Sequence, residues 1–188
     1  MISWKKAEDK LYKWSVAAIK KFASEHPDEE ICFMSFDTDP VYGYVLIAFD
    51  TLENSLKSCR ETEKFAIERR ANYLTKARSW TWAKHLLSSP VLQMFNTNSG
   101  DFKFQEFASI EFLEWQKLAE SGKYPKGTEN EDDYLESNVR ILIWKVSERL
   151  IAKNCFRSLN LATPFMIGYG IHDQEEVILR ILNWPQPN

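Results

Sequence analysis

Residues 31–51, ICFMSFDTDPVYGYVLIAFDT, constrain the fold more than any other segment, because two β-rich runs flank a short polar turn. Asp37, Asp39, Pro40 and Gly43 are residue types that favour turns. The pattern predicts a β-hairpin. In the first run both alternating sets of positions are largely apolar, so we expect this strand to be central and covered on both faces.

Helical periodicity dominates much of the remaining chain. Apolar residues recur at steps of three and four in residues 4–22 and 132–152, which is typical of helices with one buried stripe. Turn-forming residues concentrate in residues 96–101. We further expect a long or broken helix over 54–87, an extended piece near 102–107, a helix through 112–118, a strand at 164–169 and a last helix over 175–182.

These elements predict an α+β fold. We expect a small, mostly antiparallel β-sheet, formed by the hairpin 31–50 and the strand near 164–169, covered by several α-helices. The chain has 188 residues and ordinary globular composition, so we expect one domain over residues 1–188.

Charge and cysteine usage narrow the classes of function and location. The formal net charge of -3 gives no basic excess for phosphate, so we expect no nucleic-acid partner. No run approaches the ~18 apolar residues of a membrane span, so we expect no membrane partner. Three widely spaced cysteines and a first segment without a secretory apolar core predict a reducing, cytoplasmic location.

Acidic residues gather late in the chain and are our candidate partner-binding residues: Glu129, Glu131, Asp132, Asp133 and Glu136. Such a cluster can steer a basic partner, although most charge runs are solvated faces. A second acidic run, Asp28 to Glu30, is an alternative contact surface.

Several residues suggest chemistry without completing a site. Asp37, Asp39 and Asp50 bracket the hairpin and are candidates for binding a divalent cation, although aspartates are also common turn formers. His172 beside Asp173 suggests a general base, and Cys59 between Ser58 and Arg60 suggests a thiol of lowered pKa. The usual metal, nucleotide and serine-hydrolase motifs are absent from the sequence, so we assign no catalytic residue, metal ligand or cofactor.

The order of these parts resembles a bacterial family of unknown function. The residues that carry the likeness are the segments SFDTDPVYGYVLIAFDT, FNTNSGDFKFQEF and PFMIGYGIHDQEEVILRILNWP, the last following a long apolar helix. Proteins that look like this are often encoded near polymorphic or contact-dependent toxins. The resemblance implies a cytoplasmic immunity protein that binds and neutralises a cognate toxin, and it implies no catalytic residue.

Three hypotheses of function follow. The first is a protein-binding domain that acts as an immunity protein and meets a toxin through an acidic surface. The second is a metal- or ligand-dependent enzyme that uses Asp37, Asp39, Asp50 and the pair of His172 and Asp173 at the sheet ends. The third, which the high aromatic content leaves open, is a non-catalytic subunit of a homo-oligomer.

Overall fold

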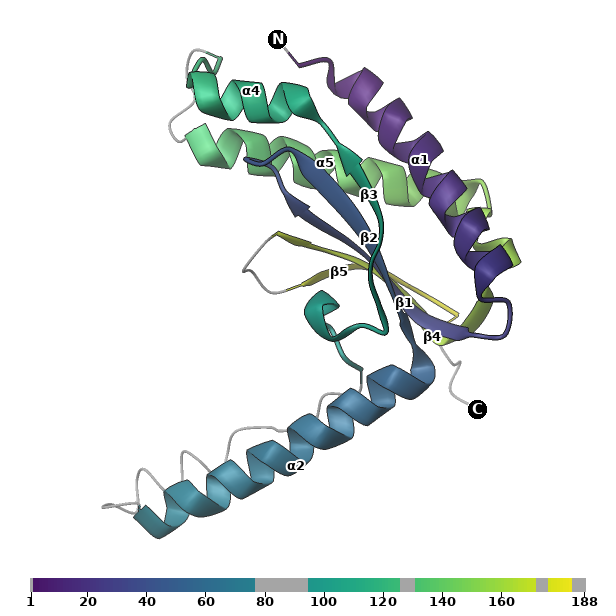
Figure 1. Ribbon diagram of the computed structural model, residues 1–188, viewed down its shortest axis with the longest axis vertical. Helices are drawn as coiled ribbons and strands as arrows, with labels where there is room; N and C mark the ends of the chain where they lie inside the picture. Colours follow the sequence, from purple (N-terminus) through teal and green to yellow (C-terminus); the bar gives the residue numbers. More distant parts are fainter. Residues whose placement is uncertain (1, 77–94, 126–130, 172–175, 184–188) are drawn as a thin grey trace.

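The computed structural model describes residues 2–76, 95–125, 131–171 and 176–183, of which 70, 73–76 and 131–133 are described at the level of the backbone (Figure 1). In chain order the elements are α1 (Trp4–Glu25), β1 (Glu30–Asp39), β2 (Tyr44–Thr51), α2 (Leu52–Lys76), the 3₁₀ turn η1 (Ser99–Asp101), β3 (Phe104–Glu111), α4 (Leu113–Ser121), α5 (Glu131–Ala152), the 3₁₀ turn η2 (Cys155–Ser158), β4 (Asn160–Ile171) and β5 (Val177–Leu182).

The five strands form one mixed sheet in the order β3-β2-β1-β4-β5. The three pairs β1 with β2, β2 with β3 and β4 with β5 are antiparallel, and β1 and β4 are parallel. Strand β1 is central, and most of its residues are buried, because it has neighbours on both sides and apolar residues toward both faces.

One face of the sheet carries the larger core. Met34, Phe36, Ile47 and Phe49 of the hairpin pack there with the buried stripes of α1 and α5, and α4 adds Trp115. The stripes form because apolar residues at helical spacing share one side of each helix. We call this side the helical face.

The opposite face, which we call the second face, carries a smaller apolar cluster and several small residues. Phe33 and Phe102 pack there with their ring centroids 5.0 Å apart, beside Ala48 and Met166. Helix α2 begins at this end of the sheet and extends away from it (Figure 1). Large apolar side chains on α2 are therefore exposed, with Phe65 at 64%.

The structure confirms the α+β class and the mostly antiparallel sheet. The hairpin, the strand near 164–169 and the helices over 4–22 and 132–152 are present as expected. The helix expected over 54–87 is present as α2 as far as residue 76, and residues 77–87 lie outside the described part. None of the described helices has the length and apolar content to span a membrane.

The helix predicted over residues 175–182 is wrong, because Val177–Leu182 form strand β5. The sequence VILRIL is rich in β-branched residues, which fit a pleated sheet better than a helix. Pairing with β4 then supplies backbone hydrogen bonds that an isolated short helix would lack.

Candidate functional site

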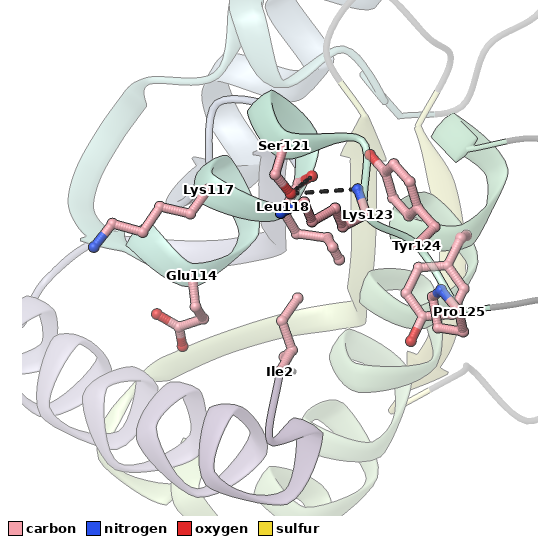
Figure 2. Close-up of a pocket in the computed structure, with 9 residues that line it drawn as sticks. Ile2, Glu114, Lys117, Leu118, Ser121, Lys123, Tyr124 and Pro125 are labelled. Carbon is pink, nitrogen blue, oxygen red and sulfur yellow. Dashed lines mark hydrogen bonds between the residues drawn. The ribbon is translucent and has the colours of Figure 1, made fainter.

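A groove of about 540 Å³ lies between the beginning of α1, helix α4 and the beginning of α5. Its walls are formed by Ile2, Glu114, Lys117, Leu118, Ser121, Lys123, Tyr124, Pro125 and Tyr134. Figure 2 shows Ile2 and Leu118 pointing toward each other across the groove, with Tyr124 and Pro125 at one end. The charged Lys117 side chain points outward at the rim (Figure 2).

Local sequence explains the shape of the groove at the end of α4. Gly122 has a φ of 59°, and its amide donates to the carbonyl oxygens of Leu118 and Ala119, which ends the helix. The Ser121 hydroxyl donates to the Leu118 carbonyl oxygen at 3.0 Å and accepts from the Lys123 amide at 3.3 Å. These bonds turn the chain so that Tyr124 and Pro125 close one end.

Aromatic packing anchors the groove to the helical face. The Tyr134 ring lies edge-on to Tyr124, with centroids 5.9 Å apart, and edge-on to Trp4 at 6.4 Å. Trp4 in turn lies 5.9 Å from the buried Trp115. Because these rings are large and have few rotamers, they define a firm apolar surface.

Part of the predicted acidic cluster lies at the start of α5, next to the groove residue Tyr134 in sequence. Glu131, Asp132 and Asp133 occupy the first helical positions, directly before the groove residue Tyr134. Glu129 lies outside the described residues, and of the next three acidic residues only the backbone is described. Glu136 forms an ion pair with Arg140 at 3.2 Å, so its charge is partly compensated within the helix.

The negative charge of the alternative acidic run, Asp28 to Glu30, is also partly compensated. Glu29 accepts from the Lys103 ammonium group at 2.7 Å, while Asp28 and Glu30 are exposed. This contact joins the loop before β1 to the segment before β3, so Glu29 has a structural role.

A second polar group lies on the second face of the sheet, away from the groove. The Ser35 hydroxyl donates to Glu176 Oε2 at 2.6 Å, and the Ser99 hydroxyl donates to Asp37 Oδ2 at 3.1 Å. Glu176 lies over Gly170, where a Cβ atom would come within 2.8 Å of its Oε1. We call Ser35, Asp37, Ser99 and Glu176 the polar cluster.

Burial changes the titration of this cluster. Burial raises the pKa of Glu176 to about 7, and the negative charge of Asp37 adds to the rise. The Ser35 hydroxyl opposes the shift most, because it donates to the charged Glu176 carboxylate, and Ser99 opposes it as well. Sequence analysis did not single out Ser35, Ser99 or Glu176, because they belong to three separate parts of the chain.

The three hairpin carboxylates do not form one site. Asp37 pairs with Leu46 and Asp50 pairs with Phe33, so the two aspartates lie about 13 Å apart at a strand rise of ~3.3 Å per residue. Asp50 therefore cannot bind one cation together with Asp37 and Asp39, as the sequence analysis considered.

Two of these aspartates have clear structural contacts. Asp39 Oδ1 accepts from the amides of Val41 and Tyr42 in the hairpin turn. Asp50 is fully buried, and its Oδ1 accepts from the amides of Thr51 and Lys103 and from the Asn54 side chain. The first set of bonds shapes the turn, and the second fixes the beginning of α2.

The remaining candidates for catalysis are His172, Asp173 and Cys59, and the structure gives none of them a catalytic arrangement among its described residues. His172 and Asp173 lie outside the described residues. Burial and the charge of Asp50 raise the pKa of the Cys59 thiol, which is opposite to the predicted lowering. Among the residues that the structure describes, no three His, Cys, Asp or Glu side chains are grouped so that they could hold a metal ion.

Comparison with known proteins adds no family to this description: no family model, no curated protein and no solved structure matches the chain.

Proposed function

We propose that this chain is a protein-binding domain that holds a partner polypeptide in the groove between α1, α4 and α5. The groove itself carries the proposal. Its inner wall is apolar, whereas the charges of Glu114, Lys117 and Lys123 belong to its lining at the rim. Protein interfaces commonly combine a buried apolar anchor with such a polar rim.

The polar atoms inside the groove favour a protein partner over a small polar substrate. The Ser121 hydroxyl is already engaged with Leu118 and Lys123. A substrate pocket needs convergent polar groups that orient the reacting molecule. An apolar wall of Ile2, Leu118 and tyrosine rings instead suits a Leu, Phe or Met side chain of a partner.

The acidic start of α5 defines the chemistry that we expect beside this anchor. Glu131, Asp132 and Asp133 precede the groove residue Tyr134 in the same helix. A partner with a basic residue next to its apolar anchor would meet these charges, which steer association and reject acidic competitors. The same acidic residues also lie at a helix N-terminus, where negative charge is stabilised.

The resemblance to immunity proteins supplies the class of partner that we propose, which is a bacterial toxin domain. We place this encounter in the cytoplasm, in keeping with three cysteines that form no disulfide. Neutralisation requires only that the bound domain cover a functional surface of the toxin, so no catalytic residue is needed.

The first test is co-purification from native cells followed by mass spectrometry and binding measurements with the purified partner. We expect the triple variant E131K/D132K/D133K, which removes charge steering, to weaken binding at least about tenfold. The groove-filling variant Ser121→Trp, which blocks the anchor, should weaken it to a similar extent. The matched variant D28K/E29K/E30K changes the same number of charges elsewhere; it also removes the partly exposed Glu29–Lys103 ion pair, whose loss costs little, and it should bind as wild type.

The two parts of the proposal fail separately. Loss of binding only in D28K/E29K/E30K would transfer the interface to that surface and contradict the groove. Co-expression with the captured partner tests neutralisation, because the partner alone should arrest growth and the wild-type chain should restore it. A partner that binds in the groove and leaves growth unaffected would contradict the immunity function alone. Circular dichroism confirms that each variant is folded.

A further inference from the structure

Strand β5 is divided into two halves by a bulge in its pairing with β4. The register shifts between Ile167 and Gly168, and Leu179 is the extra residue on β5. We call residues 177–178, which precede the bulge, the first half of β5, and residues 180–182, which follow it, the second half. Because the bulge interrupts the pairing, each half depends on its own contacts with the rest of the protein.

The second half is fixed to the helical face. The Arg180 guanidinium group lies 2.7 Å from Glu148 Oε1 on α5 and also donates to the Leu179 carbonyl oxygen. Leu179 and Leu182 are partly buried and pack against the larger core. The second half is therefore stabilised by an ion pair and by apolar packing, and neither of these depends on the polar cluster.

The first half is attached in a different way. Val177 and Ile178 are 43% and 40% exposed, so their side chains bury little apolar area. Glu176, directly before them, accepts from the fully buried Ser35 hydroxyl on β1 at 2.6 Å. Strand β4 lies between β5 and β1, so this side chain crosses β4, and it does so over Gly170. The Glu176 carboxyl therefore joins the first half of β5 to the central strand.

The surroundings of the Glu176 carboxyl favour its protonated form. Its Oε1 is buried and has no hydrogen-bond partner among the described residues, which is an unfavourable position for a charged oxygen. The charge that acts on it is that of Asp37, which is also negative. The charged or titratable groups on the described elements around it are Asp37 on β1, Asp101 on η1, Glu106 on β3 and Arg180 on β5. Three of these are acidic, and the ion pair of Arg180 lies on the helical face.

We propose that Glu176 is the titrating group of a pH-sensitive switch: its protonated carboxyl holds the first half of β5 on the sheet, and its ionisation releases this half while the second half stays paired. Release uncovers the backbone of Gly168 and Tyr169 on β4. In the open form the carboxylate reaches water, so it escapes both the cost of burial and the repulsion from Asp37. The change is reversible, because only a proton is exchanged.

The switch has a defined pH window. Burial raises the pKa of Glu176 in the closed protein from its ordinary 4.5 to about 7, whereas the released side chain is exposed to water and titrates near the ordinary value. The closed form therefore holds a proton that the open form loses between these two values. The equilibrium constant for opening should rise with pH across this window, by up to about 300-fold, and should stay constant at higher pH.

Amide hydrogen exchange of the full chain, followed by NMR from about pH 5 to about pH 8, tests the switch. Protection factors report local opening once the intrinsic pH dependence of exchange is removed. In wild-type protein, the protected amides of residues 168–169 and 177–178 should lose at least about tenfold in protection over this range. The amides of Leu182 in the second half and of Ile19 on α1 should keep theirs. In Glu176→Gln, which cannot ionise, the protection of the first half should not depend on pH.

Two further variants keep the test independent of one substitution. Ser35→Ala removes the donor that stabilises the charged carboxylate, so the loss of protection should move to higher pH. Glu148→Gln is the matched control, because it removes a carboxyl that contacts the second half, and the pH dependence of the first half should remain. Constant protection of the first half in wild-type protein, or a loss that persists in Glu176→Gln, would overturn the proposal. A parallel loss at Ile19 would also overturn it, since the whole protein would then be opening.

Discussion

The two faces of the sheet are built on different principles. On the helical face, large apolar side chains interlock. The ring centroid of Phe22 lies within 5.0 Å of the ring centroids of three other residues, Phe49, Phe104 and Phe107. On the second face, small residues such as Gly168 and Gly170 leave space that Phe33 and the carboxylate of Glu176 occupy. The helical face is stabilised by buried apolar area and close packing, and the second face is stabilised partly by a few hydrogen bonds.

Because the two faces are built differently, their contributions to stability should respond differently to pH. The described contacts on the helical face are mostly between apolar side chains, with the His26 ring beside Phe22, so their contribution should depend less on pH than that of the polar cluster. The polar cluster combines two carboxylates and two hydroxyl groups, so its contribution depends on protonation. We therefore expect the second face to open before the helical face in alkaline solution.

Removal of the central ring on the helical face should have the largest effect. Phe22 is fully buried, so Phe22→Ala should lower the free energy of unfolding by about 3 to 5 kcal/mol through lost transfer energy and a residual cavity. Phe102→Ala is the matched change on the second face and should be less damaging, because Phe102 lies in an irregular segment that can relax. Urea denaturation measures both. Equal losses would contradict the distinction between the faces.

Glu176→Gln should remove the pH dependence that Glu176 gives to the stability of the second face. The folded-state pKa of Glu176 is raised from its ordinary 4.5 to about 7, so the folded protein holds this proton between pH 4.5 and 7 while the unfolded chain releases it. Wild-type stability should therefore fall as pH rises through this window, by up to about 3 kcal/mol. The Gln variant lacks this loss and should become the more stable protein above pH 7.

Urea denaturation at half-unit pH steps measures this crossing, with Glu68→Gln as the control on the exposed side of α2. A constant difference between wild type and Glu176→Gln over the window would show that the Glu176 carboxyl does not titrate differently in the folded state.

A methyl group added on the crowded second face should have an intermediate effect. A Cβ atom at residue 168 would lie 2.8 Å from Phe33 Cζ and 3.0 Å from the Val177 carbonyl oxygen. Gly168→Ala should therefore lower the free energy of unfolding by about 1 to 3 kcal/mol. Gly100→Ala is the control, since its nearest contact is the side chain of Asn98 at 3.3 Å, and we expect a change within about 0.5 kcal/mol. Similar losses would contradict tight packing over β4.

Sequence patterns predicted the helical face better than the second face. Each buried stripe of α1 and α5 is continuous in the chain and repeats at helical spacing, so periodicity alone identifies it. The hairpin is equally easy to predict from sequence, because its turn residues and β-rich runs are adjacent in the chain. Strand β5 is harder to predict, because a six-residue, mostly apolar run has no period that separates a strand from a helix.

The sites could be predicted only in part. The acidic residues before Tyr134 were found from composition, but the groove beside them depends on residues as distant in sequence as Ile2 and Tyr124. The polar cluster likewise joins Ser35 to Glu176 across 141 positions, through the parallel pairing of β1 with β4. No short motif records such a contact, because chain topology creates it.

The smallest predicted effect concerns the hydroxyl that holds η1 to the second face. Ser99→Ala removes the 3.1 Å bond to Asp37 and should lower the free energy of unfolding by about 1 kcal/mol. Ser99 also opposes the raised pKa of Glu176, so its loss should move the midpoint of the pH dependence upward. Ser109→Ala, at an exposed position of β3, is the control for removing a hydroxyl. An unchanged midpoint would show that Ser99 holds η1 in place without stabilising the charged form of Glu176, and would reduce the titrating unit to Ser35, Asp37 and Glu176.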